Sequence, residues 1–275
     1  MTLPRVRLTP PLISGARRLL EAAAAHHARD VLRRRTGEPA IAFDGEGHEC
    51  DATFIVESHE VALQLGAARP VSSRSPLTIR LVLCLPKGDK LEWVLEKATE
   101  LGVSSVYPAQ AQRSVVRLDA ARARARAERW TRIAEGAARQ SERADVPLVH
   151  GVADLATQLR AAALGADLRL CCQERLHEAP SDGSAQHPDA PSRHSASRHG
   201  PSQSVVTLAL PVEDATPTVA VVVGPEGGLT DSEQALAQAC GYTPWSLGPR
   251  ILRAETAAIT AVAILQHALG DLARE

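Results

Sequence analysis

Two short glycine-rich segments near the C-terminal end combine residue types that can bind a ligand. The apolar run 219–223 is followed by GPEGG at 224–228, and a second short strand pattern is followed by LGPRILRAET at 247–256. Glycines let a ligand approach the main chain and permit turns with positive φ. Because ligands bind at the carboxyl ends of strands in an open α/β sheet, the pair predicts one pocket. Two ordinary strand-to-helix turns are the alternative.

Charged side chains follow the second glycine turn and can do chemistry there. Arg250 and Arg253 can hold a phosphate or a developing anion, and Glu255 can accept a proton or orient Arg253. Arg253 and Glu255 also stand at the start of an expected helix, whose positive end favours an anionic nucleophile. We therefore predict these two as the catalytic pair. The alternative for Glu255 is a carboxylate that only stabilises the helix dipole.

The elements that would position these segments alternate between strand and helix from residue 77 onward. Such alternation predicts an α/β fold, with a parallel sheet and helices on both faces. The expected elements are strand 77–85, helix 91–101 ended by Gly102, strand 103–108, helix 120–142, helix 154–164, strand 168–172, strand 218–224, helix 231–240, strand 245–247 and helix 255–269. Thr230 and Glu233 have the spacing of a capping box at the start of helix 231–240.

The first 74 residues differ in pattern and predict a small, mostly β domain. We expect a helix over 17–35, then strands at 41–43, 51–56 and 61–65, with an Asp-Gly turn after the first. A Ser-rich linker at 70–76 leads to the second domain, 75–275. Within that domain, 178–204 is rich in Pro, Ser, His and Gly. Its composition cannot offset the entropy of ordering, so we expect a disordered insertion that catalysis does not need.

Composition narrows the class of protein. The chain has 275 residues, no apolar run near the length of a membrane span, and no signal-peptide layout at its start. Its five cysteines show no C-x-x-C spacing, which predicts neither a zinc site nor a disulfide framework. We expect a cytoplasmic protein that needs no metal.

The distribution of arginine favours a phosphate-bearing partner, although the net charge is −1. Residues 1–35 hold eight Arg against two acids, 8 − 2 = +6, and residues 113–143 hold nine Arg against four acids, 9 − 4 = +5. Clustered arginine makes a local footprint for phosphate that the total charge conceals. Solvated helix faces are the alternative.

Several blocks of the sequence, in order, resemble the RsmE family, the SPOUT-class methyltransferases that make 3-methyluridine in 16S rRNA. The blocks are KATELGV at 97–103, RSVV at 113–116, AARQSER at 137–143 and the two glycine-rich segments. The similarity spans most of the chain. One position departs, because many relatives carry Thr where Ala254 stands, so no hydroxyl there can be essential.

The resemblance implies a knotted parallel-sheet methyltransferase domain, the SPOUT trefoil-knot fold, preceded by a PUA-like β-barrel that holds RNA. It implies S-adenosyl-L-methionine as cofactor, 16S rRNA or the small ribosomal subunit as partner, and a homodimer packed through the knot and last helix. The cofactor residues it implies are Cys172, Val223, Gly224, Pro225, Glu226, Gly228, Leu247, Gly248, Ile251, Leu252 and Arg253. The implied RNA contacts are Arg33, Arg113, Gln140, Arg143 and Arg250.

Two other functions stay open at this point. A knotted methyltransferase acting on another RNA, or at a ribose 2′-oxygen, would carry similar loops. An RNA-binding ribosome-assembly factor that lost the chemistry would retain the fold. No G-x-G-x-x-G follows a strand, and no Gly-Lys-Ser/Thr follows GPEGG, which argues against a Rossmann dinucleotide site and a P-loop.

Overall fold

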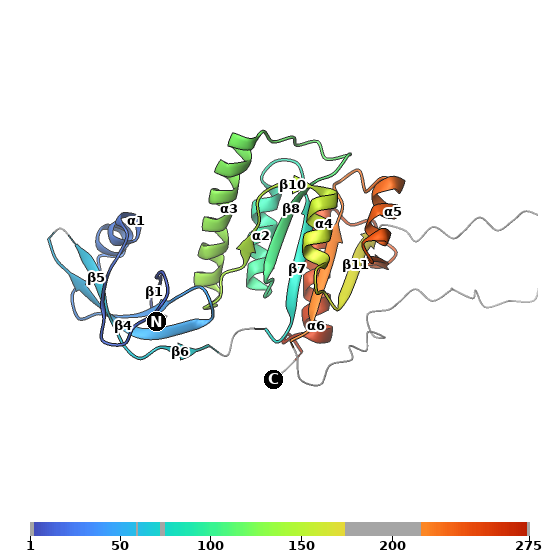
Figure 1. Cartoon of the computed structure of the whole chain (residues 1–275). Helices are drawn as coiled ribbons and strands as arrows, with labels where there is room; N and C mark the ends of the chain where they lie inside the picture. Colours follow the sequence, from blue (N-terminus) through green and yellow to red (C-terminus); the bar gives the residue numbers. More distant parts are fainter. Residues whose placement is uncertain (1–2, 59, 72–74, 174–215, 274–275) are drawn as a thin grey trace, which may run out of the picture.

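The computed structural model describes residues 3–58, 60–71, 75–173 and 216–273. These residues build two sheets, one from the first 70 residues and one from residue 78 onward. Figure 1 shows the N-terminal sheet beside the larger C-terminal part, with helix α3 (Ala120–Gln140) between them. The predicted insertion at 178–204 and residues 72–74 of the predicted linker lie outside the described residues.

The N-terminal sheet is mainly antiparallel and has the order β1-β3-β4-β5-β2. Only the pairing of β1 with β3 is parallel. Phe54 and Leu63 are fully buried in its core. Its strands are β1 (Arg5–Arg7), β2 (Arg17–Leu19), β3 (Pro39–Phe43), β4 (His48–Val56) and β5 (Val61–Leu65), and β6 (Arg69–Pro70) pairs with β4.

The predicted helix over 17–35 is wrong at its start. Arg17–Leu19 forms β2 and pairs antiparallel with β5, while helix α1 covers only Ala22–His26 and a π-helical turn, η1, continues over His27–Val31. Arg18 also donates hydrogen bonds to the main-chain oxygens of two residues upstream. The partner strand lies more than forty residues away in sequence, so local periodicity carries no sign of the pairing.

The second sheet is parallel throughout, as the sequence predicts. Its order is β10-β8-β7-β12-β11-β13, with β9 paired to β8. The strands are β7 (Thr78–Cys84), β8 (Ser105–Gln110), β9 (Leu148–Val149), β10 (Ala153–Asp154), β11 (Leu168–Gln173), β12 (Thr218–Val223) and β13 (Thr243–Ser246). Central strand β12 is almost entirely buried, which explains its unbroken apolar sequence.

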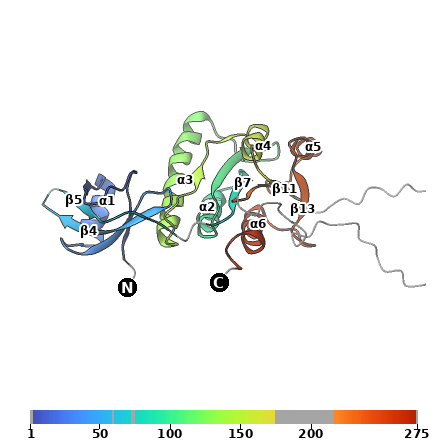
Figure 2. The same cartoon turned by 60° about the horizontal axis from the view of Figure 1, so that its bottom comes forward.

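Helices cover both faces of this sheet (Figure 2). Helices α2 (Lys90–Glu100), α3 and α6 (Ala254–Leu269) pack with alternate strand residues such as Leu81 and Val221 in one core cluster. Helices α4 (Leu155–Ala163) and α5 (Asp231–Ala239) pack on the opposite face with Val82 and Val222. The alternation follows from the two-residue period of a strand.

The helix ends follow local signals in the sequence. The predicted capping box is confirmed, because Thr230 and Glu233 exchange hydrogen bonds at the start of α5. Asp154 accepts a hydrogen bond from the main chain of Thr157 and caps α4. Gly102, with φ of +86°, follows the end of α2. Among the described helices, none combines the length and apolar character that crossing a membrane requires.

Candidate functional site

A cavity of about 440 Å³ opens at the carboxyl ends of β11, β12 and β13. This volume falls within the usual range for small-molecule sites. The β12–α5 loop and the β13–α6 loop, which contain the two glycine-rich segments, form most of its wall. The structure thus brings the two segments together in one pocket.

All of the predicted cofactor residues line this cavity. Five come from the end of β12 and the loop after it, one from the end of β11, and the other five from the loop before α6. They are Cys172, Val223, Gly224, Pro225, Glu226, Gly228, Leu247, Gly248, Ile251, Leu252 and Arg253. Burial raises the pKa of the Cys172 thiol, so this side chain presents a neutral sulfur to the cavity.

Two glycines in the wall need the freedom of a missing side chain. Gly228 has φ of +68° and its main-chain N–H donates to the oxygen of Pro225, 2.8 Å away, closing a tight turn. Gly248 has φ of +109°. A Cβ at either position would have no heavy atom within 4 Å. The main chain at both glycines is therefore accessible to a ligand.

Arg113 lies at this pocket and joins two of its loops. Its guanidinium Nη1 donates to the main-chain oxygen of Gly227 at 2.9 Å. The neighbouring Gln112 main-chain N–H donates to Glu233 Oε1 at 2.7 Å. The β8–α3 loop is thus held against the β12–α5 loop, and the predicted RNA contact Arg113 lines the cavity.

Lys90 of α2 links two segments at the pocket, the β12–α5 loop and the start of α6. Its ammonium lies 3.2 Å from Glu226 Oε1 and 3.2 Å from Glu255 Oε1. Burial raises the pKa of Glu226, but hydrogen bonds from main-chain N–H groups and Lys90 outweigh that effect and lower it overall. Hydrogen bonds to both carboxylates raise the pKa of Lys90. Glu226 and Lys90 are therefore both charged near neutral pH.

The two residues of the predicted catalytic pair have different surroundings. Arg253 is exposed, lines the cavity and directly precedes α6. Glu255 is not among the lining residues, and its side chain is 15% exposed. Its Oε2 atom is buried without a hydrogen-bond partner among the described residues. Its other carboxylate oxygen pairs with Lys90, which links the first turn of α6 to α2.

The other predicted RNA contacts divide into exposed and buried residues. Arg250 is exposed at the cavity, and Gln140 and Arg33 are exposed outside its lining. Arg143 is only 5% exposed, and its guanidinium is hydrogen-bonded within the protein. Its position does not suit an RNA contact. A sequence motif does not show whether a side chain is buried, so the sequence alone did not distinguish Arg143 from a surface arginine.

Two glutamines in the wall were not predicted from the sequence. Gln173 Nε2 donates to Gln234 Oε1 at 3.3 Å, and both residues line the cavity. Gln173 directly follows the predicted strand 168–172, so the rule about carboxyl strand ends was a usable signal. Gln234 lies inside the first turns of α5, where nothing in the sequence marks it. Among the described residues, no group of three or more His, Cys, Asp or Glu side chains is arranged to bind a metal.

Comparison with known proteins identifies the family. The model of the RNA methyltransferase domain family matches residues 73–266. The ribosomal RNA small subunit methyltransferase E of Bacillus subtilis is 34% identical over 244 residues, covering 88% of this chain and 86% of that protein. The protein of the same name from Mycobacterium tuberculosis is 31% identical over 258 residues, covering 90% of this chain and 86% of its own length.

Solved structures agree with the sequence comparison. A Legionella pneumophila methyltransferase with bound S-adenosylmethionine has a TM-score of 0.78 and 31% identity, covering 99% of this chain and 100% of that one. The Neisseria gonorrhoeae ribosomal RNA small subunit methyltransferase E, bound to S-adenosylmethionine, has a TM-score of 0.78 and 27% identity, with 98% and 100% covered. By sequence and by fold, the chain belongs to the ribosomal RNA small subunit methyltransferase E family.

Proposed function

We propose that this protein transfers a methyl group from S-adenosylmethionine to N3 of a uridine in 16S rRNA. The observation that carries the proposal is the single pocket formed by the two glycine-rich loops at the carboxyl ends of β12 and β13. Family membership along almost the whole chain supports the reaction class. The Legionella and Neisseria relatives, whose structures contain S-adenosylmethionine, support the cofactor.

The residues present fit this cofactor. The open positions beside Gly228 and Gly248 expose main-chain groups that can hold an adenine, and half-buried Cys172 and Leu247 add apolar surface. Carboxylate Glu226 and the glutamines Gln173 and Gln234 supply hydrogen-bonding groups in the wall. When bound, S-adenosylmethionine supplies a methyl group activated by its sulfonium. No metal is required, because the sulfonium already makes a good leaving group.

The protein's task is to align the uridine and to stabilise its N3 anion. Uridine N3 carries a proton, which must pass to a base or to solvent before the nitrogen attacks the methyl group. Arg253 can stabilise the negative charge on the uracil oxygens, and its position in the cavity lining at the positive end of α6 supports this role. Arg250, exposed at the same cavity, can hold a phosphate of the RNA. Glu255 supports Arg253 by fixing the first turn of α6 through Lys90.

We further propose that the N-terminal β domain, 1–74, is a PUA-like RNA-binding module and that 75–275 is a SPOUT domain with a trefoil knot. The strand orders of the two sheets and the membership of the family support this assignment. A homodimer packed through α6 is part of the same proposal. Because the substrate is ribosomal RNA, we infer that the protein acts in the cytoplasm.

Methylation of purified rRNA and of small ribosomal subunits tests the proposal. Subunits or rRNA lacking the modification, incubated with the protein and labelled S-adenosylmethionine, should gain label on one uridine. A methyl at N3 blocks Watson–Crick pairing and stops reverse transcription at that nucleotide. A methyl at a ribose 2′-oxygen would instead protect the adjacent phosphodiester from alkali. Cofactor binding without any transfer to rRNA would favour the assembly-factor alternative.

A further inference from the structure

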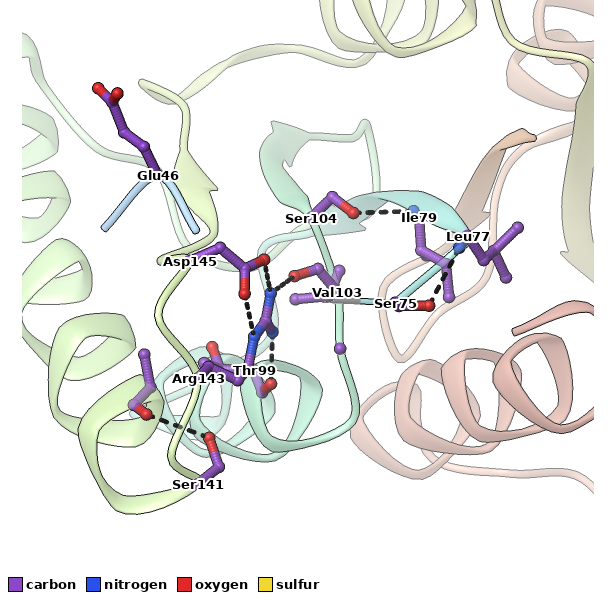
Figure 3. Close-up of polar contacts among 12 residues, drawn as sticks. Glu46, Ser75, Leu77, Ile79, Thr99, Val103, Ser104, Ser141, Arg143 and Asp145 are labelled. Atoms are coloured by element: carbon purple, nitrogen blue, oxygen red, sulfur yellow. Dashed lines mark hydrogen bonds and ion pairs between the residues drawn. The ribbon is translucent and has the colours of Figure 1, made fainter. Parts of the chain in front are cut away.

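The two parts of the protein meet where the loop after α3, residues 141–146, contacts the β3–β4 turn, residues 44–47. Val146 N–H donates to the oxygen of Gly45 at 3.0 Å, and Gly47 N–H donates to the oxygen of Ala144 at 3.2 Å. Asp145 forms isolated β-bridges with the turn. Figure 3 shows Glu46 of the turn beside the loop that carries Asp145. We call this contact the junction.

One buried side chain shapes the loop side of the junction. Arg143 Nη1 donates to the oxygen of Thr99 at 2.6 Å, and Nη2 donates to the oxygen of Val103 at 3.1 Å (Figure 3). The same guanidinium binds both carboxylate oxygens of Asp145, at 2.6 and 3.2 Å. Such a two-point pair fixes direction as well as distance. The loop is therefore tied to the end of α2 and to the segment before β8.

The backbone next to Arg143 shows that the loop is held in a specific shape. Glu142 has φ of +59°, in the left-handed region that residues other than glycine rarely adopt. Such a conformation persists only where the surroundings impose it. The hydrogen bonds of Arg143 on one side and the contact with the turn on the other provide those surroundings.

The turn side is shaped in advance as well. Asp44 is 5% exposed, and its Oδ1 accepts hydrogen bonds from the main chain of Glu46 at 2.7 Å and of His48 at 3.0 Å. Strand β1 adds two contacts between the two parts of the protein, beside the junction. Arg5 Nη2 donates to the oxygen of Arg143 at 3.4 Å, and Arg7 pairs with Glu135 of α3.

We propose that the Arg143–Asp145 pair is a positioning device that sets the orientation of the N-terminal sheet relative to the pocket. The inference rests on the proposed function, in which a large RNA contacts both parts at once. When two contacts are held at a fixed separation, the second forms at a high effective concentration. Arg143 thus acts on RNA binding through the junction, as a positioning residue, and Asp145 completes its geometry.

The test uses two substitutions in the full-length protein, one on each side of the junction. Asp145→Asn weakens the pair on the loop side, and Asp44→Ala removes the acceptor that shapes the turn. Each should raise the KM for small subunits about tenfold, while kcat and the Kd for S-adenosylhomocysteine stay within about twofold. Because both act on one contact, the double variant should raise KM much less than the product of the single effects.

Arg80→Lys is the matched control. Arg80 also donates to main-chain oxygens, including that of Ala162 at 3.1 Å, but it joins β7 to α4 away from the junction. Its KM for small subunits should equal that of the wild type. Arg143→Lys provides a further variant, with KM expected to rise at unchanged cofactor affinity. Should that variant fail to fold, Asp145→Asn and Asp44→Ala still carry the test, because both keep the guanidinium.

The outcomes separate the positioning role from the proposed function. An unchanged KM in Asp145→Asn and Asp44→Ala, or KM effects that multiply in the double variant, would overturn the positioning role. A loss of cofactor affinity in step with KM would also overturn it, since a purely structural role predicts that result. A wild-type protein that binds S-adenosylhomocysteine but modifies no rRNA would refute the proposed function itself.

Discussion

Arg253 and Glu255 are two positions apart, yet the structure gives them distinct environments. Arg253 faces the cavity with an exposed guanidinium, whereas the Glu255 carboxylate pairs with Lys90 outside the cavity lining. The motif predicted both residues together because sequence spacing cannot show which way a side chain turns at a helix start. Their separate roles are open to a direct kinetic comparison.

Replacing Arg253 should affect turnover more than cofactor binding. Arg253→Ala removes a donor that stabilises charge only in the transition state, so we expect a loss of about 100-fold in kcat. Glu255→Gln keeps the shape and loses only the ion pair, so its effect should be several-fold smaller. Single-turnover methylation of small subunits, with calorimetry of S-adenosylhomocysteine, measures both quantities. Wild-type turnover in Arg253→Ala would remove that residue from the mechanism.

Substitution at Gly228 should abolish cofactor binding by filling the pocket. The positive φ of Gly228 means that Gly228→Val also strains the backbone, so loss of binding alone is ambiguous. Gly165 has a similar φ, +64°, and equally open surroundings, but it lies in the turn between α4 and β11. Gly165→Val therefore controls for strain. Calorimetry should show binding in Gly165→Val and none in Gly228→Val; equal affinities would place the ligand elsewhere.

At the scale of elements, Lys90 connects α2 to two pocket segments, the β12–α5 loop and the start of α6. Lys90→Met should weaken S-adenosylhomocysteine binding by at most about fivefold, because partly exposed ion pairs contribute little. Lys97→Met is the control, since the partners of Lys97 among the described residues are Glu96 and Glu100 on its own helix. An effect of equal size in both variants would show that the link does not act on the pocket.

The pH dependence of this link follows from the two pKa shifts. The pKa of Glu226 lies below its usual 4.5. The contribution of its ion pair with Lys90 to ligand affinity is therefore present above pH 4.5 and is lost as the pH falls through the lowered pKa. The pKa of Lys90 lies above its usual 10.5, so its contribution is lost only as pH rises through the raised value. The ratio of the affinities of the wild type and of Lys90→Met for S-adenosylhomocysteine should therefore be constant from about pH 6 to 9. It should shrink in stronger acid.

The sequence predicted the longer strands of the parallel sheet and helices α2 to α6 because their signals are local, but it missed the two-residue strands β9 and β10. Apolar periodicity marked α2 and α6, and the capping box marked the start of α5. Strand β2 was missed because its evidence is a partner strand distant in sequence. The pocket walls followed from the rule about strand ends, while Lys90 and Gln234 join the site through folding that no local pattern displays.

At the scale of the whole molecule, the count of arginines overstated the free positive charge near the N-terminus. Partners from other elements neutralise several of them: Arg5 pairs with Glu49, and Arg17 with Glu57. Arg7 pairs with Glu135 of α3. A window of sequence counts only the acids inside it, so distant partners were invisible. The interpretation of the arginines of residues 1–35 as a phosphate footprint is weakened accordingly.

The molecule should be a symmetric dimer in solution. Helix α6 keeps Ile259, Ala263 and Ile264 only half-buried, and Ile251 just before it is 62% exposed. Apolar surface of this kind favours burial against a second copy. Light scattering at micromolar concentration should give twice the chain mass of 29.2 kDa. A mass of one chain would contradict the prediction, and Ile251→Glu should shift the equilibrium towards that mass.

The place of β12 in its sheet determines when the enzyme can become active during synthesis. This strand lies between β7 and β11, both of which leave the ribosome earlier. Until residues 218–223 emerge, β7 lacks one neighbouring strand and β11 lacks both, and such unpaired edges can pair with a wrong strand. One side of the pocket wall follows later still, in the loop before α6. A nascent chain thus completes its cofactor site only after residues 247–253 have left the ribosome.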